Sequence, residues 1–201
     1  MSGFTECRVD HAILKRARGG DMKAHEILYR VYATPVYSLA TRMLQSAALA
    51  DEVLQETAIE VIRKLESLRE PAAFPGWIKR VAVNKCLAHL RSAWHQKSSA
   101  TAPDAEIGDG GWLEGSDHGA ASERLHGAMD IATALALLPP VARSVVWLHD
   151  VEGLTHAEIG RMMGKTTSFS KSQLSRAHQR LRDQLAESDG DHTCMPQPNS
   201  C

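Results

Sequence analysis

Residues 138–185 read LPPVARSVVWLHDVEGLTHAEIGRMMGKTTSFSKSQLSRAHQRLRDQL and predict three consecutive helices. A proline pair opens the first helix, since proline suits a first helical turn. Thr155 and Glu158 have the spacing of a capping box, which predicts the start of a second, short helix. Gly164 can adopt the left-handed conformation that ends a helix, so the third helix begins beyond it. Two helices joined by such a glycine turn are typical of a helix-turn-helix motif.

The third helix of this stretch has two chemically different faces. Apolar residues recur from Leu174 to Leu185 at steps of three and four, and residues 165–182 contain five Lys or Arg and no Asp or Glu. A basic surface attracts phosphates by releasing counterions, and short polar side chains beside arginine suit base edges in the major groove. DNA binding is the favoured interpretation, and a solvated amphipathic helix in a bundle is the alternative. The polar face comprises Lys171, Ser172, Ser175, Arg176 and Gln179.

The composition restricts the class of protein. The chain has 201 residues, a formal net charge of −1 and 5% aromatic residues. This length allows one domain or two small ones, and the scarcity of β-branched runs favours an all-α fold. No apolar stretch is long enough to span a bilayer, and Met1–Arg8 lacks the features of a signal peptide. The four cysteines show no paired spacing, which indicates a reduced, cytoplasmic setting.

The first part of the chain also predicts helices. Residues 10–45 read as helices that are broken at Gly19-Gly20 and around Pro35. Residues 50–68 predict a clearer helix, because their apolar residues recur at steps of four and three.

An acidic stripe runs along the first half of that clearer helix. Four carboxylates occur in ten residues, with no basic residue before Arg63. A solvated surface is one interpretation, since acids are favoured near a helix N-terminus. A docking face for a basic partner is the other. The stripe comprises Asp51, Glu52, Gln55, Glu56 and Glu60.

A second basic stretch occupies residues 69–97. A helix is predicted from Trp77, and residues 77–97 contain five Lys or Arg and no acid. Phe74, Trp77 and Trp94 are interleaved with these charges. Aromatic rings can stack unpaired bases while cations hold the nucleic-acid backbone. Trp77 as an anchor in the hydrophobic core is the alternative.

Serine, alanine and glycine dominate residues 98–121, which contain five acids and no Lys or Arg. These residues are too poor in apolar side chains to pack, so they predict a mobile linker. Their charge is opposite to that of the basic stretches on either side, which makes them a candidate phosphate mimic. The predicted domains are residues 10–97 and 122–187, and residues 188–201 predict a disordered tail.

Three segments, in this order, resemble the extracytoplasmic-function sigma factors of bacterial RNA polymerase, in the sigma-70 family. ADEVLQETAIEVIRKL (residues 50–65) is similar to the family's polymerase-binding helix. FPGWIKRVAVNKCLAHLR (residues 74–91) is similar to the helix that reads the −10 promoter element, and residues 138–185 resemble the domain that reads the −35 element. The resemblance implies an all-α fold with two small helical domains, sigma region 2 and sigma region 4, joined by a flexible linker.

The same resemblance implies function, partners and contact residues. It implies a cytoplasmic sigma factor that directs transcription initiation at specific promoters in a stress or envelope response. It also implies that the protein is not an enzyme and that it needs no cofactor or metal. The implied partners are promoter DNA, an anti-sigma factor or other regulator, and core RNA polymerase, through the clamp helices of its largest subunit and the flap of its second largest. The implied polymerase contacts are Asp51, Glu52, Gln55 and Glu56. The −10 contacts are Phe74, Trp77, Lys79, Arg80, Asn84, Lys85 and Arg91. The −35 contacts are Thr166, Ser168, Phe169, Lys171, Ser172, Ser175, Arg176 and Arg180.

Five positions depart from the family pattern. Leu49 stands where an acid usually opens the polymerase-binding motif, and Ala88 replaces a common Asp. Phe169 replaces a usual Thr, and its ring is a candidate contact for a thymine methyl unless the helix begins in a shifted register. Ser170 stands where an apolar residue usually packs. Gln173 replaces a usual Arg, which removes one phosphate contact.

Two regulatory hypotheses follow from particular residues. A phosphate on Thr57 would restore the negative charge that Leu49 removes. His192, Cys194 and Cys201 in the tail are candidates for metal binding or redox sensing, but their spacing matches no standard metal site and a disordered tail is favoured.

Two other classes of protein remain as alternatives. A free-standing helix-turn-helix regulator would sense a signal with its first domain and bind palindromic DNA as a dimer. A hydrolytic enzyme has weaker support, because the ten histidines form no metal or triad pattern and no glycine-rich phosphate loop occurs.

Overall fold

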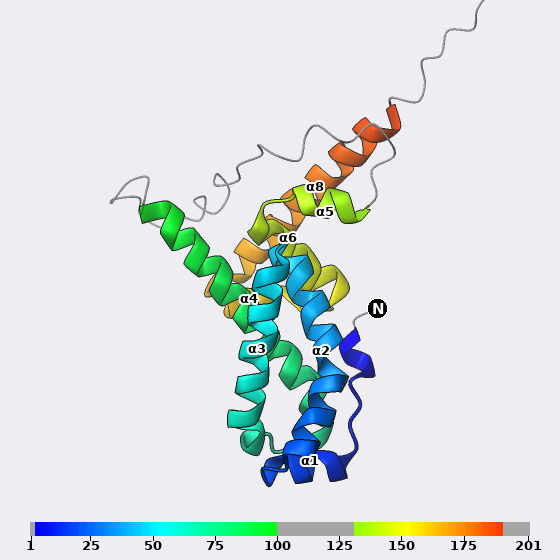
Figure 1. Ribbon diagram of the computed structural model, residues 1–201. Coiled ribbons are helices and arrows are strands. Elements are labelled where there is room, and N and C mark those ends of the chain that lie inside the picture. Colours follow the sequence, from blue (N-terminus) through cyan, green and yellow to red (C-terminus); the bar gives the residue numbers. More distant parts are fainter. Residues whose placement is uncertain (1–2, 100–130, 191–201) are drawn as a thin grey trace, which may run out of the picture.

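Helices dominate the computed structural model, which describes residues 3–99 and 131–190 (Figure 1). The predicted all-α fold is therefore confirmed. The first part of the chain forms η1 (Gly3–Glu6), α1 (His11–Arg18), α2 (Met22–Leu44), α3 (Ala47–Lys64), η2 (Leu65–Ser67), η3 (Pro71–Ala73) and α4 (Phe74–Ser99). The second part forms α5 (Ile131–Leu137), α6 (Pro140–Val146), the π-helical segment η4 (Trp147–Val151), α7 (His156–Met163) and α8 (Thr167–Gly190).

Helices α2 and α3 pack side by side, and α4 packs against both of them (Figure 1). Side-chain caps fix where the first two begin. Asp21 accepts a hydrogen bond from the backbone N–H of Lys23 at 2.9 Å, and Ser46 accepts one from the backbone N–H of Leu49 at 3.3 Å. Between these helices Gln45 adopts a left-handed conformation with φ 53°, which ends α2 and turns the chain into α3.

Helix α2 continues through Pro35, so the predicted break around this residue is wrong. A proline inside a helix leaves the carbonyl four residues earlier without its usual donor. That carbonyl belongs to Val31, and Cys7 Sγ donates to it at 3.6 Å. A segment far away in sequence therefore satisfies the group that proline leaves free. The break predicted at Gly19-Gly20 is confirmed, and Gly20 adopts φ 82° there.

Helices α7 and α8 form the predicted helix-turn-helix. The capping box is confirmed: Glu158 accepts from the backbone N–H of Thr155 at 2.9 Å, and Thr155 Oγ1 accepts from the backbone N–H of Glu158 at 3.3 Å. Gly164 ends α7 with φ 68°, as its position predicted. Thr166 Oγ1 then accepts from the backbone N–H of Phe169 at 3.1 Å, which caps the start of α8.

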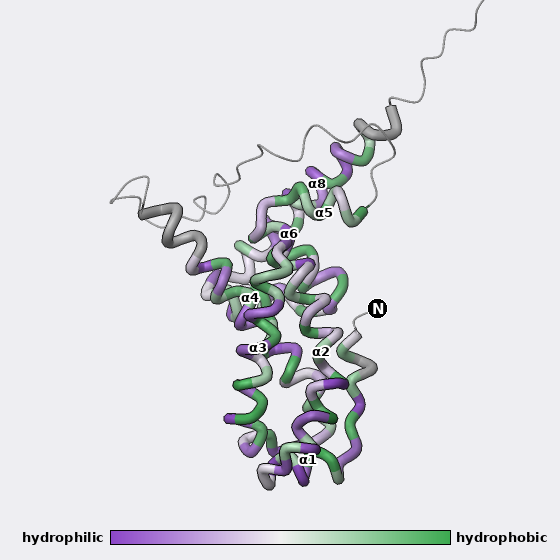
Figure 2. The backbone as a smooth tube through the Cα atoms, viewed as in Figure 1, coloured by the Kyte–Doolittle hydropathy of each residue, from purple (hydrophilic) through white to green (hydrophobic). Residues whose placement is uncertain are grey.

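The two parts of the chain pack against each other, and their buried apolar residues form one continuous core. Figure 2 shows hydrophobic stretches along the helices of both parts. The buried Arg143 of α6 donates to the Met43 carbonyl of α2, at 3.4 Å from Nε and 3.2 Å from Nη2. Burial lowers the pKa of Arg143 to about 10, so its guanidinium remains charged at neutral pH. Arg42 lies over the Trp147 ring, 4.7 Å from its centroid.

None of the helices in residues 3–99 and 131–190 combines the length and apolarity needed to cross a membrane.

Candidate functional site

One exposed face of α3 carries the acidic stripe. Ile59 and Ile62 continue this face at steps of three and four, with 49% and 53% of their surface exposed. Neither isoleucine was predicted as a contact from the sequence, although their spacing from Gln55 was a usable signal. The face therefore combines carboxylates at its start with apolar side chains further along. Its predicted contacts are Asp51, Glu52 and Gln55, which are exposed, and Glu56, which is half-buried.

Ion pairs connect the acidic stripe to α4. Glu56 lies 3.4 Å from Lys85 Nζ and 3.5 Å from His89 Nε2, and Glu52 lies 3.9 Å from His89 Nδ1. A hydrogen bond from Lys64 lowers the pKa of Glu60 on the same helix. Lys85, a predicted −10 contact, is thus tied to α3, and the two predicted surfaces are direct neighbours.

A single face of α4 carries most of the predicted −10 contacts. Trp77, Arg80, Asn84 and Arg91 recur at steps of three, four and seven, which place them on one side of the helix. Arg80, Asn84 and Arg91 are exposed, and Trp77 is half-buried against the core. Trp77 therefore packs partly on the core, as the alternative predicted, and leaves part of its ring exposed, as the predicted stacking role requires. Phe74 is buried, with its ring centroid 6.2 Å from that of Trp77, so its prediction as a direct −10 contact is wrong for this conformation and it supports the tryptophan from below the surface.

Lys79 lies on another side of α4 and contacts the second part of the chain. Its Nζ donates to the Glu152 carbonyl at 3.0 Å and lies 3.5 Å from Glu152 Oε2. The Glu152 side chain is only 3% exposed, and its Oε1 accepts from the Trp147 indole N–H at 3.2 Å. This conformation therefore holds Lys79 in the seam between the two parts of the chain.

Replacing Glu152 by alanine is expected to lower the free energy of unfolding by about 2 kcal/mol, because it leaves the Trp147 indole donor without its acceptor and removes the carboxylate that pairs with Lys79, although the bond from Lys79 to the main-chain carbonyl of residue 152 remains. Urea denaturation of the Lys79/Glu152 double-mutant cycle measures the coupling. The pair Glu26–Arg30, with 2.6 Å between its charged atoms and side chains that are 59% and 76% exposed, is the matched control and should contribute about 0.5 kcal/mol or less. Equal coupling energies in the two cycles would show that the buried Lys79–Glu152 pair stabilises the fold no more than an exposed ion pair does.

The polar face of α8 lies open to solvent. Ser172 is half-buried and donates to the Phe169 carbonyl at 2.9 Å, so its oxygen remains available as an acceptor. The predicted contacts that are exposed are Thr166, Ser168, Lys171, Ser175, Arg176 and Arg180.

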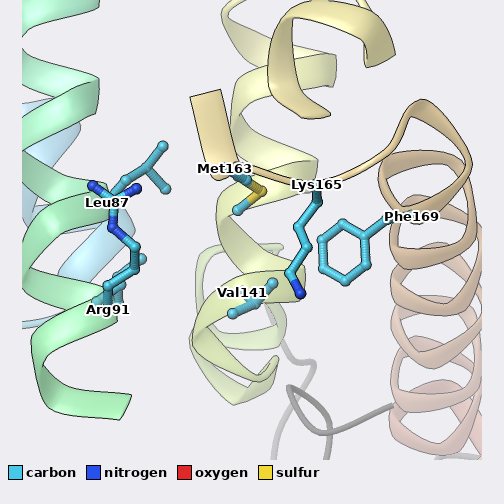
Figure 3. A pocket seen from close by; sticks show the side chains of 7 residues that line it. Leu87, Arg91, Val141, Met163, Lys165 and Phe169 are labelled. Atoms are coloured by element: carbon cyan, nitrogen blue, oxygen red, sulfur yellow. The ribbon is translucent and has the colours of Figure 1, made fainter. Parts of the chain in front are cut away.

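Phe169 does not lie on this polar face, which corrects its prediction as a candidate contact for a thymine methyl. Its ring is 1% exposed, and Lys165 Nζ lies 5.8 Å from the ring centroid. Figure 3 shows the ring beside Lys165, in a small pocket where Leu87 and Arg91 of α4 face Val141 and Met163 of the second part. The register of α8 explains the difference, because its third residue turns toward the core when the helix begins at Thr167.

Two neighbours of Phe169 also point inward. Ser170 is buried, as the resemblance implies for this position, and its Oγ lies 3.1 Å from His156 Nδ1. Gln173 is buried too, and neither atom of its amide has a hydrogen-bond partner. Its burial agrees with the prediction that Gln173 makes no phosphate contact.

Thr57 is buried, and its Oγ1 has no hydrogen-bond partner. A phosphate at this atom would have to enter the core, so the phosphorylation hypothesis is wrong for this conformation.

Burial raises the pKa of the Cys86 thiol to about 12, which leaves it unreactive. Within residues 3–99 and 131–190, no three His, Cys, Asp or Glu are placed to hold a metal ion. The tail residues His192, Cys194 and Cys201 and the linker acids lie outside the described residues.

Comparison with known proteins gives the same two-part division. The description "Sigma-70 region 2" matches residues 28–96, and "Sigma-70, region 4" matches residues 128–181. The chain is 32% identical over 171 residues to the ECF RNA polymerase sigma factor SigE of Mycolicibacterium smegmatis, covering 83% of this chain and 63% of SigE. It is 31% identical over 174 residues to the ECF RNA polymerase sigma factor SigM of Mycobacterium tuberculosis, covering 87% of this chain and 83% of SigM.

A solved structure has the same fold. The sigma factor RpoE of Bartonella quintana, crystallised with the anti-sigma factor NepR, superposes with a TM-score of 0.51 at 18% identity. The superposition covers 84% of this chain and 98% of that one, and at this identity it supports the fold alone.

Proposed function

Because this chain belongs to the extracytoplasmic-function sigma factors, which direct RNA polymerase to promoters, we propose that three of its exposed faces divide that work. The α3 face binds the clamp helices of the largest polymerase subunit. The α4 face captures bases of the melted −10 strand, and the polar face of α8 reads the −35 duplex. The chain catalyses no reaction, since sigma factors are not enzymes.

The observation that carries this proposal is the grouping of chemically matched side chains on each face. The α3 face offers carboxylates and two isoleucines, which suit a basic helical partner with apolar contacts. The α4 face offers an aromatic ring, two arginines and an amide, which suit unpaired bases and their backbone. A flipped base costs a few kcal/mol, which stacking on Trp77 offsets.

To contact the −10 and −35 promoter elements at the same time, as proposed, the two parts of the chain must separate. The −10 and −35 elements lie about 25 base pairs apart, or roughly 85 Å along the duplex. Lys79 of the first part and Glu152 of the second are bonded directly in this conformation. We infer that this docked arrangement is the state before promoter binding, and that polymerase and DNA replace the contacts at the seam.

Further partners follow from the family. RpoE of Bartonella quintana was crystallised with an anti-sigma factor, and a regulator of that kind is proposed for this chain. The chain is proposed to act in the cytoplasm and to contact the flap of the second-largest polymerase subunit as well. The stress or envelope response stays a prediction. A free-standing regulator is less well supported, because both parts of the chain match sigma-70 regions.

Reversing the charge of Glu52 to lysine is expected to weaken binding to bacterial core RNA polymerase about tenfold, because a lysine there repels a basic partner. Fluorescence titration of labelled chain with purified core enzyme measures this affinity. Glu26→Lys is the matched control: it makes the same change in net charge at an exposed position of α2 and should leave the affinity unchanged. The wild-type chain should also give the core enzyme specific run-off transcripts from genomic fragments. Equal affinity of the two variants contradicts the assignment of the α3 face.

A further inference from the structure

Three histidines and one aspartate form a connected histidine cluster (His149, Asp150, His156 and His178). Asp150 lies 2.8 Å from His149 Nδ1 and 2.7 Å from His178 Nε2, using a different oxygen for each. The rings of His149 and His156 stack, with centroids 4.4 Å apart and 18° between their planes. His156 Nδ1 lies 3.1 Å from Ser170 Oγ. The histidine cluster therefore links η4, α7 and α8.

The histidine cluster borders the polar face of α8. His178 follows Lys171 and Ser175 at steps of four and three, so all three residues lie on one side of the helix. Lys171 and Ser175 are exposed, and the side chains of His149 and His178 are 33% and 39% exposed. The imidazoles are therefore accessible at the edge of the surface proposed to meet DNA.

Charges within the cluster disfavour the imidazolium form of His156 in the free chain. Burial first, and then the charges of His149 and Lys171, lower the pKa of His156, with Asp150 opposing them. Burial by itself raises the pKa of Asp150, but its hydrogen bonds to His149 and His178 outweigh this and hold the pKa below its ordinary value. Asp150 is thus ionised near neutral pH, and the net charge of the cluster changes only with its imidazoles.

We propose that the histidine cluster is a proton-dependent binding site for the phosphate backbone of duplex DNA, at the edge of the −35 surface. This inference rests on the proposed function of α8. A phosphate beside His156 offsets the positive charge of Lys171 and therefore favours the imidazolium form of His156. Because Nδ1 is bonded to Ser170, Nε2 is the nitrogen that donates to the phosphate. DNA binding then takes up a proton, and the affinity rises as the pH falls through the range in which imidazoles titrate.

The test measures binding of the full chain to a labelled mixed-sequence DNA duplex by fluorescence anisotropy, over a range of salt concentrations at about pH 6 and about pH 8. Affinity should be about tenfold higher at the lower pH, and the salt dependence should steepen by about 0.9 for one added phosphate contact. His156→Gln should abolish both changes. His11→Gln, at an exposed histidine of α1, is the matched control and should keep both changes.

A second measurement does not depend on any variant. Calorimetric titration of the wild-type chain in buffers of different ionisation enthalpy should show uptake of about one proton on DNA binding below neutral pH. Absence of proton uptake, or an unchanged pH dependence in folded His156→Gln, overturns the inference. Lys171→Ala tests the proposed function separately, since it should weaken binding at both pH values. If it has no effect at either pH, the assignment of α8 fails as well.

Discussion

Replacing Phe169 by alanine is expected to lower the free energy of unfolding by about 3–5 kcal/mol, the cost of removing a fully buried aromatic ring. The ring fills the space between Val141 and Met163 of its own domain and Leu87 of α4, so its loss leaves a cavity in the seam. Urea denaturation followed by circular dichroism measures the change. DNA affinity should fall for all sequences alike, because the helix-turn-helix as a whole is weakened.

The controls separate a core role from a DNA-reading role. Phe169→Leu keeps most of the apolar volume and should cost about 1.5 kcal/mol or less. Ser168→Ala changes the preceding, exposed residue and should alter the free energy of unfolding by about 0.5 kcal/mol at most. If the Phe169→Ala variant had normal stability but an altered base preference, the assignment of Phe169 to the core would be wrong and its ring would belong to the DNA-facing surface.

Replacing Gly160 by alanine is expected to destabilise the helix-turn-helix by about 3 kcal/mol through overpacking. A Cβ at this position would lie 2.8 Å from the Thr166 carbonyl oxygen and 2.9 Å from that of Lys165. Both atoms belong to the backbone of the turn that leads into α8, so neither can move without displacing that helix. Alanine usually stabilises a helix relative to glycine by about 1 kcal/mol, so the predicted sign is the reverse of the usual one.

Gly76→Ala provides the control for this second change. Gly76 also lies in a helix, α4, and nothing lies within 4 Å of a Cβ built there. Its replacement should be neutral or stabilising. Thermal unfolding of both variants measures the contrast, and similar midpoints would mean that the turn between α7 and α8 yields to the added methyl group.

Local chemistry was enough to predict most of the fold. The capping box at Thr155 and Glu158 and the left-handed Gly164 act within a few residues, and the structure places both as predicted. Pro35 shows where such reasoning stops. The cost of this proline inside α2 is reduced by the Cys7 thiol, which donates to the Val31 carbonyl. That contact exists only after the chain has folded.

The candidate sites divide in the same way. The family resemblance grouped Trp77, Arg80 and Asn84 as −10 contacts, and their spacing along α4 puts them on one face in the structure. Burial of Thr57 and Phe169 was not predictable, because it depends on which helix packs over each side chain. Docking of the two parts was equally beyond the sequence, since it relies on contacts such as that of Arg143 with a carbonyl one hundred residues earlier.

The hydrogen bonds of Arg143 restrict amino-acid substitutions differently on the two sides of the seam. Its acceptors at Met43, Ala136 and Leu138 are main-chain carbonyls, which every amino acid carries. Missense changes at those three codons leave the oxygens in place, whereas a change at codon 143 removes every donor at once. These hydrogen bonds therefore constrain only codon 143, whereas packing, not hydrogen bonding, restricts changes at the buried Met43 and Leu138.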